Sequence, residues 1–172
     1  ANTNISASDT AYDGQTVIVQ SGTLTIAGQH AFARLVVLGG AKVTHLATDA
    51  TTIQRLTFNA GAIYVACDGA LDATSLGFTG SANGYGRTWP NTTTNGSFNG
   101  AGGSHGGRGG AHDAIGDSAL TYGSITDPNE PGGAGGQYSL ATCSVCNNGG
   151  GIIRVTAGAF VLDGKVLANQ WS

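Results

Sequence analysis

The sequence predicts an all-β protein in which short strands stack as a solenoid, interrupted by one long glycine-rich excursion. The main observation is a pattern that occurs four times, over residues 17–26, 35–45, 56–65 and 153–162. Each copy has two alternating apolar residues, then a glycine, then two further alternating apolar residues. We expect each copy to form two short strands joined at a glycine corner. Such a unit buries its apolar face only when copies stack.

Composition supports the same fold class. Glycine supplies 30 of the 172 residues, and charged residues make up only 10%. Glycine weakens a helix interior, whereas Val and Thr favour strands. Alternation with period two, as in Thr23-Leu24-Thr25-Ile26, is typical of strands with one inward face. No segment has a convincing helical period.

The apolar alternation gives the strands in order. The first three copies begin 18 and then 21 residues apart, which suits two or three strands per coil and is short for a βαβ unit of about 30 residues. The second copy slips by one residue after Gly40, and a bulge that aims His45 is one explanation. The predicted strands are 15–20, 23–27, 34–38, 42–46, 53–58, 62–66, 151–157, 159–163 and 165–168.

The chain divides into a terminal segment and one domain. We expect residues 1–14 to form an N-terminal tail or an exchanged strand, and residues 15–172 to form a single domain with a glycine-rich insertion at about 78–150. Ordered irregular structure is expected in the insertion, since flexible Gly/Ser linkers seldom carry bulky anchors. The anchors are Tyr85, Trp89, Phe98, Tyr122 and Tyr138.

Seven short pieces, in order, resemble a glycine-rich β-helix module that recurs in very large secreted or surface proteins of bacteria. They are His30-Ala31-Phe32 with Leu35, Gly40-Ala41-Lys42-Val43-Thr44-His45, Gly69-Ala70-Leu71-Asp72 with Gly77-Phe78, Gly102 to Gly110, Tyr122-Gly123-Ser124 with Pro128 and Glu130-Pro131-Gly132, Gly149 to Val155, and Leu162 to Asn169. The resemblance covers about residues 15–169. It implies a right-handed parallel β-helix in adhesin-like or matrix-like proteins, and it implies no catalytic set. The chain differs from the module in two ways. It is one short copy and not a long array, and it has an insertion that runs from Cys143 to Cys146.

Three cysteines leave at least one thiol unpaired within the chain. Cys143 and Cys146 suit a redox dithiol, half a zinc site or a local disulfide. Their flanks predict a loop rather than the helix N-terminus that favours a redox thiolate, and no second Cys-x-x-Cys is present. We therefore prefer a structural disulfide between Cys143 and Cys146. His105 and His112 could join them on a metal, but the favoured interpretation is that His105 and Arg108 donate hydrogen bonds to loop carbonyls.

The densest group of acids is Asp113, Asp117, Asp127 and Glu130. With backbone carbonyls of the glycine-rich loops, these carboxylates are candidate ligands for Ca²⁺, because hard cations take oxygen ligands. The alternative is turn formation and solubility. Two of these acids also meet the minimum for a glycosidase pair. An enzyme is the minority interpretation, and no other cofactor is expected.

Two surface features point to carbohydrate. Tyr85 and Trp89 in the insertion are candidates for stacking on glycans, although covering the flank of the solenoid is the alternative. Asn4, Asn91 and Asn95 stand in Asn-x-Ser/Thr sequons and are candidate glycosylation sites.

Charge and hydropathy exclude some classes of partner. A net charge of −3 with no basic stripe argues against nucleic acid. No apolar run reaches the ~18 residues that span a bilayer, so membrane insertion is not expected. The chain begins at Ala1, as chains do after secretory cleavage, and a cloned fragment would begin in the same way. We therefore expect an extracellular or cell-surface protein.

The functional prediction rests on the two ends of the expected solenoid. Open sheet edges pair with other chains, and head-to-tail contacts build open filaments. The extended N-terminal stretch containing Asn4 and Ile5 is expected to add to a neighbour's sheet. Trp171 is a further candidate assembly residue, and the alternative is that it caps the last coil of its own chain. We therefore predict a secreted, non-catalytic structural protein that self-associates head to tail into fibres or a surface layer. The alternatives are an adhesin or carbohydrate-binding module, and a polysaccharide lyase or hydrolase.

Overall fold

The computed structural model describes residues 2–80, 84–111, 116–137 and 148–170. The chain forms two compact units. Unit 1 comprises Ala1–Leu46, Arg55–Ala73 and Ile153–Leu167, and unit 2 comprises Ala47–Gln54, Thr74–Ile152 and Ala168–Ser172.

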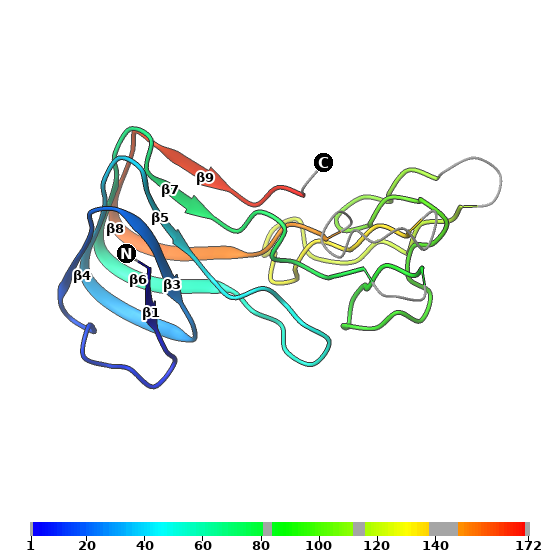
Figure 1. The fold of residues 1–172 in the computed structure, drawn as a ribbon, viewed down its shortest axis with the longest axis horizontal. Helices are drawn as coiled ribbons and strands as arrows, with labels where there is room; N and C mark the ends of the chain where they lie inside the picture. The colour runs from blue at the N-terminus through cyan, green and yellow to red at the C-terminus, as the bar shows by residue number, and fades with distance from the viewer. Residues whose placement is uncertain (1, 81–83, 112–115, 138–147, 171–172) are drawn as a thin grey trace. The chain divides into compact units, whose positions relative to one another are not determined.

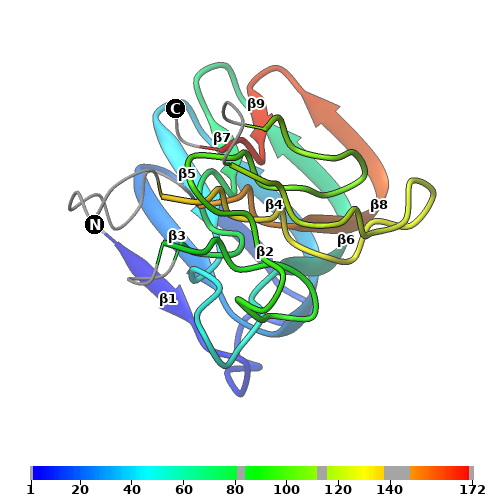
Figure 2. The same ribbon diagram turned by 90° about the vertical axis from the view of Figure 1, so that its right-hand side faces the viewer.

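The described residues of unit 1 contain nine strands that alternate along the chain between two parallel sheets. One sheet has the order β1-β3-β5-β7-β9 and the other the order β2-β4-β6-β8. In both sheets the strands follow one another in chain order, so that β1 and β9 lie at opposite edges (Figures 1 and 2). The strands are β1 Thr3–Ile5, β2 Thr16–Val19, β3 Gly22–Ile26, β4 Gln29–Val37, β5 Ala41–Thr44, β6 Leu56–Val65, β7 Ala70–Asp72, β8 Ile153–Leu162 and β9 Lys165–Leu167.

The core of unit 1 consists of apolar columns that run across the parallel strands. Because the strands pair in register, the inward residues of successive strands stack on one another. In the four-stranded sheet one column is Val17, Leu35, Ile63 and Phe160. In the five-stranded sheet another is Leu24, Val43, Leu71 and Val166. The middle members of each column are almost fully buried.

The prediction of a right-handed parallel β-helix, a closed solenoid, was wrong. The strands form two open sheets of five and four strands, and no closed coil is found in the described ranges. The part of the prediction that is confirmed is the all-β class with parallel strand pairing. No helix occurs among the described residues. A closed coil needs a regular turn, whereas residues 73–152 separate β7 from β8.

The glycines of the repeated pattern play two different roles. Gly22 and Gly40 lie at corners with φ of 75° and 74°, a conformation that glycine adopts without strain. Gly61 and Gly158 instead lie within the ten-residue strands β6 and β8. A Cβ atom on Gly61 would lie 2.7 Å from the carbonyl oxygen of Ala33, so the close approach of neighbouring backbones requires glycine there. The predicted strand breaks at these two glycines were therefore wrong.

One additional residue explains the slip in the second copy. Two residues, 20–21, separate β2 from β3, whereas three residues, 38–40, separate β4 from β5. The ladder between β3 and β5 is nevertheless regular, with Gly22 beside Ala41 and Leu24 beside Val43. The slip therefore comes from a longer corner and not from a bulge.

Unit 2 has little regular structure in its described part. Three isolated antiparallel bridges occur in that part, at Gly80 with Gly86, Thr88 with Thr92, and Phe98 with Asp117. Backbone–backbone hydrogen bonds connect the glycine tracts, as between the Gly132 N–H and the Gly150 carbonyl at 2.9 Å.

Two buried serines tie the loops of unit 2 together. The Ser97 hydroxyl donates to the Gly102 carbonyl at 2.8 Å and accepts from the Ala119 N–H at 2.9 Å. The Ser104 hydroxyl donates to the Ala119 carbonyl and accepts from the Gly109 N–H. Side-chain hydroxyls thus satisfy backbone groups that a sheet would otherwise pair.

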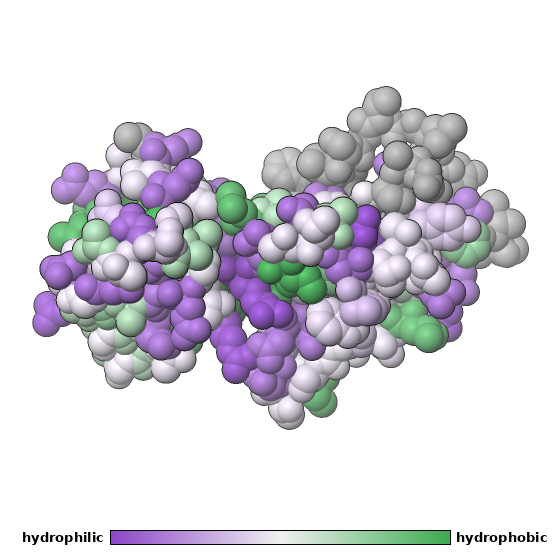
Figure 3. All heavy atoms as spheres, turned by 90° about the horizontal axis from the view of Figure 1, so that it is seen from below, coloured by the Kyte–Doolittle hydropathy of each residue, from purple (hydrophilic) through white to green (hydrophobic). Residues whose placement is uncertain are grey.

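The described residues contain no helix long and apolar enough to cross a membrane. On the face drawn in Figure 3, hydrophobic residues form separate patches among hydrophilic ones.

Candidate functional site

Among the described strands of unit 1, the apolar columns end at β8 and β9. Phe160 and Leu162 in β8 are each 44% exposed, and Val166 in β9 is 42% exposed. Their neighbours in the ladders, Ile63 and Val65 among them, are at most 1% exposed. In the described part of the chain no strand pairs with the outer side of β8 or β9. We call Phe160, Leu162 and Val166 the terminal apolar row.

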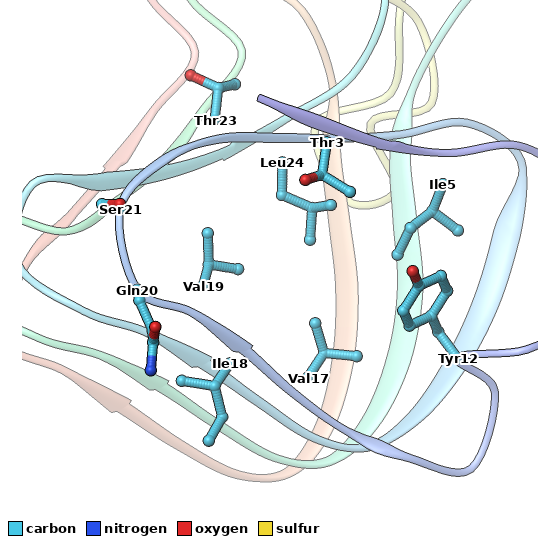
Figure 4. Close-up of a pocket in the computed structure, with 10 residues that line it drawn as sticks. All are labelled: Thr3, Ile5, Tyr12, Val17, Ile18, Val19, Gln20, Ser21, Thr23 and Leu24. Carbon is cyan, nitrogen blue, oxygen red and sulfur yellow. The ribbon is translucent and has the colours of Figure 1, made fainter. Parts of the chain in front are cut away.

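The opposite edge of unit 1 carries a hollow of about 310 Å³ between β1, β2 and β3. Ile5 and Leu24 point into it from one sheet, and Val17 and Val19 point into it from the other (Figure 4). Ile18 also borders the hollow, but its side chain lies on the opposite side of β2 from those of Val17 and Val19 and is 54% exposed. The two edges of unit 1 therefore differ, because one presents exposed apolar side chains and the other a depression that is lined by apolar residues together with polar ones such as Thr3, Gln20 and Thr23.

A turn between β1 and β2 shields part of this second edge. The Asp13 carboxylate accepts from the Ala31 N–H at 3.2 Å and lies 3.1 Å from Nδ1 of buried His30. The Gly14 N–H donates to the Ala31 carbonyl at 2.7 Å. The first half of β4 is thus capped by a turn, while β2 alone forms the outer strand beside its second half.

The two edges carry opposite charge. Residues 2–21 contain Asp9 and Asp13 and no Lys or Arg. The segment 153–167 contains Arg154 and Lys165 against Asp163. Asp163 hydrogen-bonds within its own chain to Tyr64, and this bond and the carboxylate charge raise the pKa of the Tyr64 phenol. The two edges are therefore complementary in charge, in addition to differing in shape.

The predicted assembly residues lie in part at these edges. Asn4 and Ile5 belong to β1, which pairs with β3 of the same chain. Asn4 is exposed, whereas Ile5 is buried and lines the hollow. Trp171 lies outside the described residues. Sequence reasoning missed the terminal apolar row, because the repeated pattern placed Phe160 and Leu162 on the inward face of a strand without indicating that this strand lies at an edge.

Unit 2 has a groove of about 760 Å³ that includes one of the two predicted glycan-binding residues. Tyr85 lines the groove and is 44% exposed, and its ring centroid lies 5.6 Å from that of Phe98. Trp89 is 41% exposed and is not among the lining residues. The lining residues are Tyr85, Thr93, Thr94, Asn95, Gly96, Phe98, Arg108, Asp117, Ser118 and Leu120.

The predicted Ca²⁺ ligands are not brought together among the described residues. Asp117 forms an ion pair with Arg108 at 2.7 Å. Asp127 and Glu130 accept hydrogen bonds from Asn129 at 3.0 and 3.2 Å, and so serve a turn. Asp113 lies outside the described residues. Within the described ranges no group of three His, Cys, Asp or Glu side chains is placed to hold a metal ion.

The remaining predicted sites are spread over the chain. Cys143 and Cys146 lie outside the described residues, and Cys67 is an exposed free thiol. The side-chain amide of Asn91 donates to the Asp49 carbonyl at 3.1 Å, whereas Asn95 is exposed at the groove. These sequons therefore differ in how accessible the amide nitrogen is.

Among the described residues, two histidines have a ring nitrogen without a hydrogen-bond partner. In unit 1, His45 is 2% exposed, its Nδ1 lies 2.6 Å from the Leu46 carbonyl oxygen, and burial lowers its pKa. In unit 2, His105 packs edge-on against Tyr122 with ring centroids 5.2 Å apart. Burial, with a smaller effect of the Glu130 charge, raises the pKa of Tyr122. Tyr122 donates to the Pro131 carbonyl at 2.7 Å, which gives it a structural role.

No family model, curated protein or solved structure matches the chain.

Proposed function

We propose that this protein is a secreted, non-catalytic structural subunit that self-associates head to tail. In the assembly, β8 and β9 of one copy lie against β2 and β1 of the next. The observation that carries the proposal is the exposure of the terminal apolar row, which continues columns that are otherwise buried.

Backbone hydrogen bonding favours this contact. An outer strand presents unpaired N–H and C=O groups that pair readily with another strand. All strand pairings described in unit 1 are parallel, so a second copy in the same orientation extends both sheets with the same geometry. Such a contact joins two different surfaces, and it therefore repeats into an open filament.

The favourable contributions to the contact and the cost of association are of similar size. Burying the remaining exposed surface of Phe160, Leu162 and Val166 contributes roughly 1 kcal/mol each, since full burial of such side chains is worth about 1.5–3 kcal/mol. Each new ladder hydrogen bond adds about 1 kcal/mol. Association itself costs about 4–15 kcal/mol. The balance is narrow, so assembly depends on concentration and on each apolar contact.

Shape and charge support a second copy as the occupant. The hollow beside β1 and β2 offers apolar walls to the terminal apolar row of another copy. Asp9 and Asp13 lie on one of the two edge-forming segments, and Arg154 and Lys165 lie on the other. A secreted location rests on the resemblance to glycine-rich modules of secreted and surface proteins, and it is part of the proposal.

Two lysine variants of β8 test the proposal. Phe160 points into the core column, whereas Val161 follows it on the opposite face of the strand, and the two are 44% and 50% exposed. We expect the native chain to form particles that grow with concentration in sedimentation velocity and negative-stain micrographs. Phe160→Lys should abolish them, because a charge would enter the contact, while Val161→Lys should retain them. A native chain that stays monomeric up to millimolar concentration would overturn the proposal.

A further inference from the structure

We propose that the groove in unit 2 is a binding site for a neutral saccharide. This inference is independent of the assembly proposed above, because every lining residue belongs to unit 2. The residues that would bind the sugar are Tyr85, Phe98, Arg108 and Asp117, with the hydroxyls of Thr93 and Thr94 beside them.

The aromatic pair supplies a platform for a sugar ring. The rings of Tyr85 and Phe98 lie 5.6 Å apart with an interplanar angle of 34°, and Tyr85 remains 44% exposed. The face of an aromatic ring carries partial negative charge, which attracts the C–H groups on the apolar face of a pyranose. A tyrosine held against a second ring loses little conformational freedom on binding.

A fixed ion pair supplies the polar side of the groove. The Arg108 Nη2 donates to Asp117 Oδ1 at 2.7 Å, and Nε donates to the Ser118 hydroxyl at 3.1 Å. Both charged side chains are more than half exposed. A carboxylate accepts hydrogen bonds and a guanidinium donates them. Because a sugar hydroxyl both donates and accepts, the Arg108–Asp117 pair can bind neighbouring hydroxyls of one sugar.

The backbone holds the aromatic and polar parts side by side. Phe98 and Asp117 form an antiparallel bridge in which the Phe98 N–H donates to the Asp117 carbonyl at 3.0 Å. The bridge therefore places a ring and a carboxylate at neighbouring positions of the groove wall. A preorganised site of this kind avoids an ordering cost when the ligand binds.

Charge and size indicate the class of saccharide. Arg108 and Asp117 neutralise each other, and the other lining residues are uncharged, so the groove does not favour a polyanion. Its volume of about 760 Å³ falls within the range of about 300–1,000 Å³ that is usual for ligand sites. We therefore expect an oligosaccharide of neutral hexoses or pentoses.

The test is calorimetric titration of the full chain with gluco-, manno- and xylo-oligosaccharides, and with oligogalacturonate as the acidic comparison. At least one neutral series should bind, and Tyr85→Ala and Asp117→Asn should each weaken that binding at least tenfold. Trp89→Ala is the matched control, because Trp89 is a similarly exposed aromatic residue that does not line the groove, and its binding should equal that of the native chain.

The assembly variant Phe160→Lys separates this inference from the proposed function, since it should bind the saccharide as the native chain does. Failure of all three neutral series to bind would overturn the inference. Stronger binding of oligogalacturonate, or native affinity in both groove variants with unchanged circular dichroism, would also overturn it.

Discussion

Phe160 lies directly beside Ile63 in the parallel ladder of β8 and β6, yet Ile63 is 1% exposed and Phe160 is 44% exposed. Both residues occupy the same column and point to the same side of their sheet. Ile63 has a strand on each side, whereas Phe160 has a strand on one side only in the part of the chain that the structure describes. A further strand beside β8 would bury Phe160 as fully as Ile63.

We predict that Gly61→Ala destabilises unit 1 by about 1–3 kcal/mol, the usual cost of forcing extra volume into a packed interior. The new Cβ would lie 2.7 Å from the Ala33 carbonyl oxygen, so the backbone of β4 or β6 must shift. Urea unfolding measures the change. The control is Gly107→Ala, where a Cβ would meet no atom within 4 Å, and its effect should stay within about 0.5 kcal/mol. Equal effects of the two substitutions would contradict the account of strand packing.

Gly61 also shows which features of the fold could not be predicted from the sequence. The apolar alternation located most of the strands and their inward faces. However, Gly22 at a corner and Gly61 within a strand stand in the same local pattern, and only the neighbouring backbone distinguishes them. The three-residue strands β1 and β7 were not among the predicted strands, whereas β9, which is equally short, was predicted at 165–168.

The residues of the candidate sites could likewise be predicted only in part from the sequence. The pattern that contains Phe160 is the one that contains Ile63, so no local feature of the sequence separates an exposed end from a buried middle. Tyr85 was predicted as a glycan contact from its type and segment. Arg108 and Phe98 were not, because the groove is formed by loops whose proximity depends on irregular backbone hydrogen bonds.

We predict that His45 makes the stability of unit 1 depend on pH. Burial lowers its pKa in the folded chain below the ordinary value of 6.5, so the unfolded chain binds the proton more readily. The resulting stability is present above pH 6.5 and is lost as the pH falls below that value. Urea unfolding at a series of pH values should show this decrease, and His45→Gln should flatten it. A native profile identical to that of His45→Gln on the acid side of neutrality would show that His45 does not contribute.

We predict that Ser104→Ala loosens unit 2. The substitution leaves the Ala119 carbonyl and the Gly109 N–H without their side-chain partner, and an unsatisfied buried group costs about 1–3 kcal/mol. Hydrogen exchange should become faster at amides near 104–119, while the amides of β4 and β6 keep their protection. The matched control is Ser124→Ala, which removes an exposed hydroxyl whose hydrogen bonds go to Thr126 and Asp127 of its own turn. Native exchange rates throughout the Ser104→Ala variant would rule out this role.

Head-to-tail assembly also predicts which residues meet at the junction. Val17, Leu35, Ile63 and Phe160 share one level of the four-stranded sheet. If the next copy continues the sheet in the same register, Phe160 lies beside Val17 of that copy. Within one chain these two residues are three strand spacings apart, about 14 Å, which is too far for a disulfide. A disulfide between these positions therefore has to join two copies.

The most direct test is oxidation of a chain carrying Val17→Cys and Phe160→Cys, with Cys67, Cys143 and Cys146 each replaced by Ser to remove the native thiols. The account predicts a ladder of covalent oligomers on a non-reducing gel. A matched variant with Val17→Cys and Val155→Cys, whose second cysteine lies five residues along the same strand, should form few of them. Monomers in the first variant, or equal ladders in both, would contradict head-to-tail extension of the sheets.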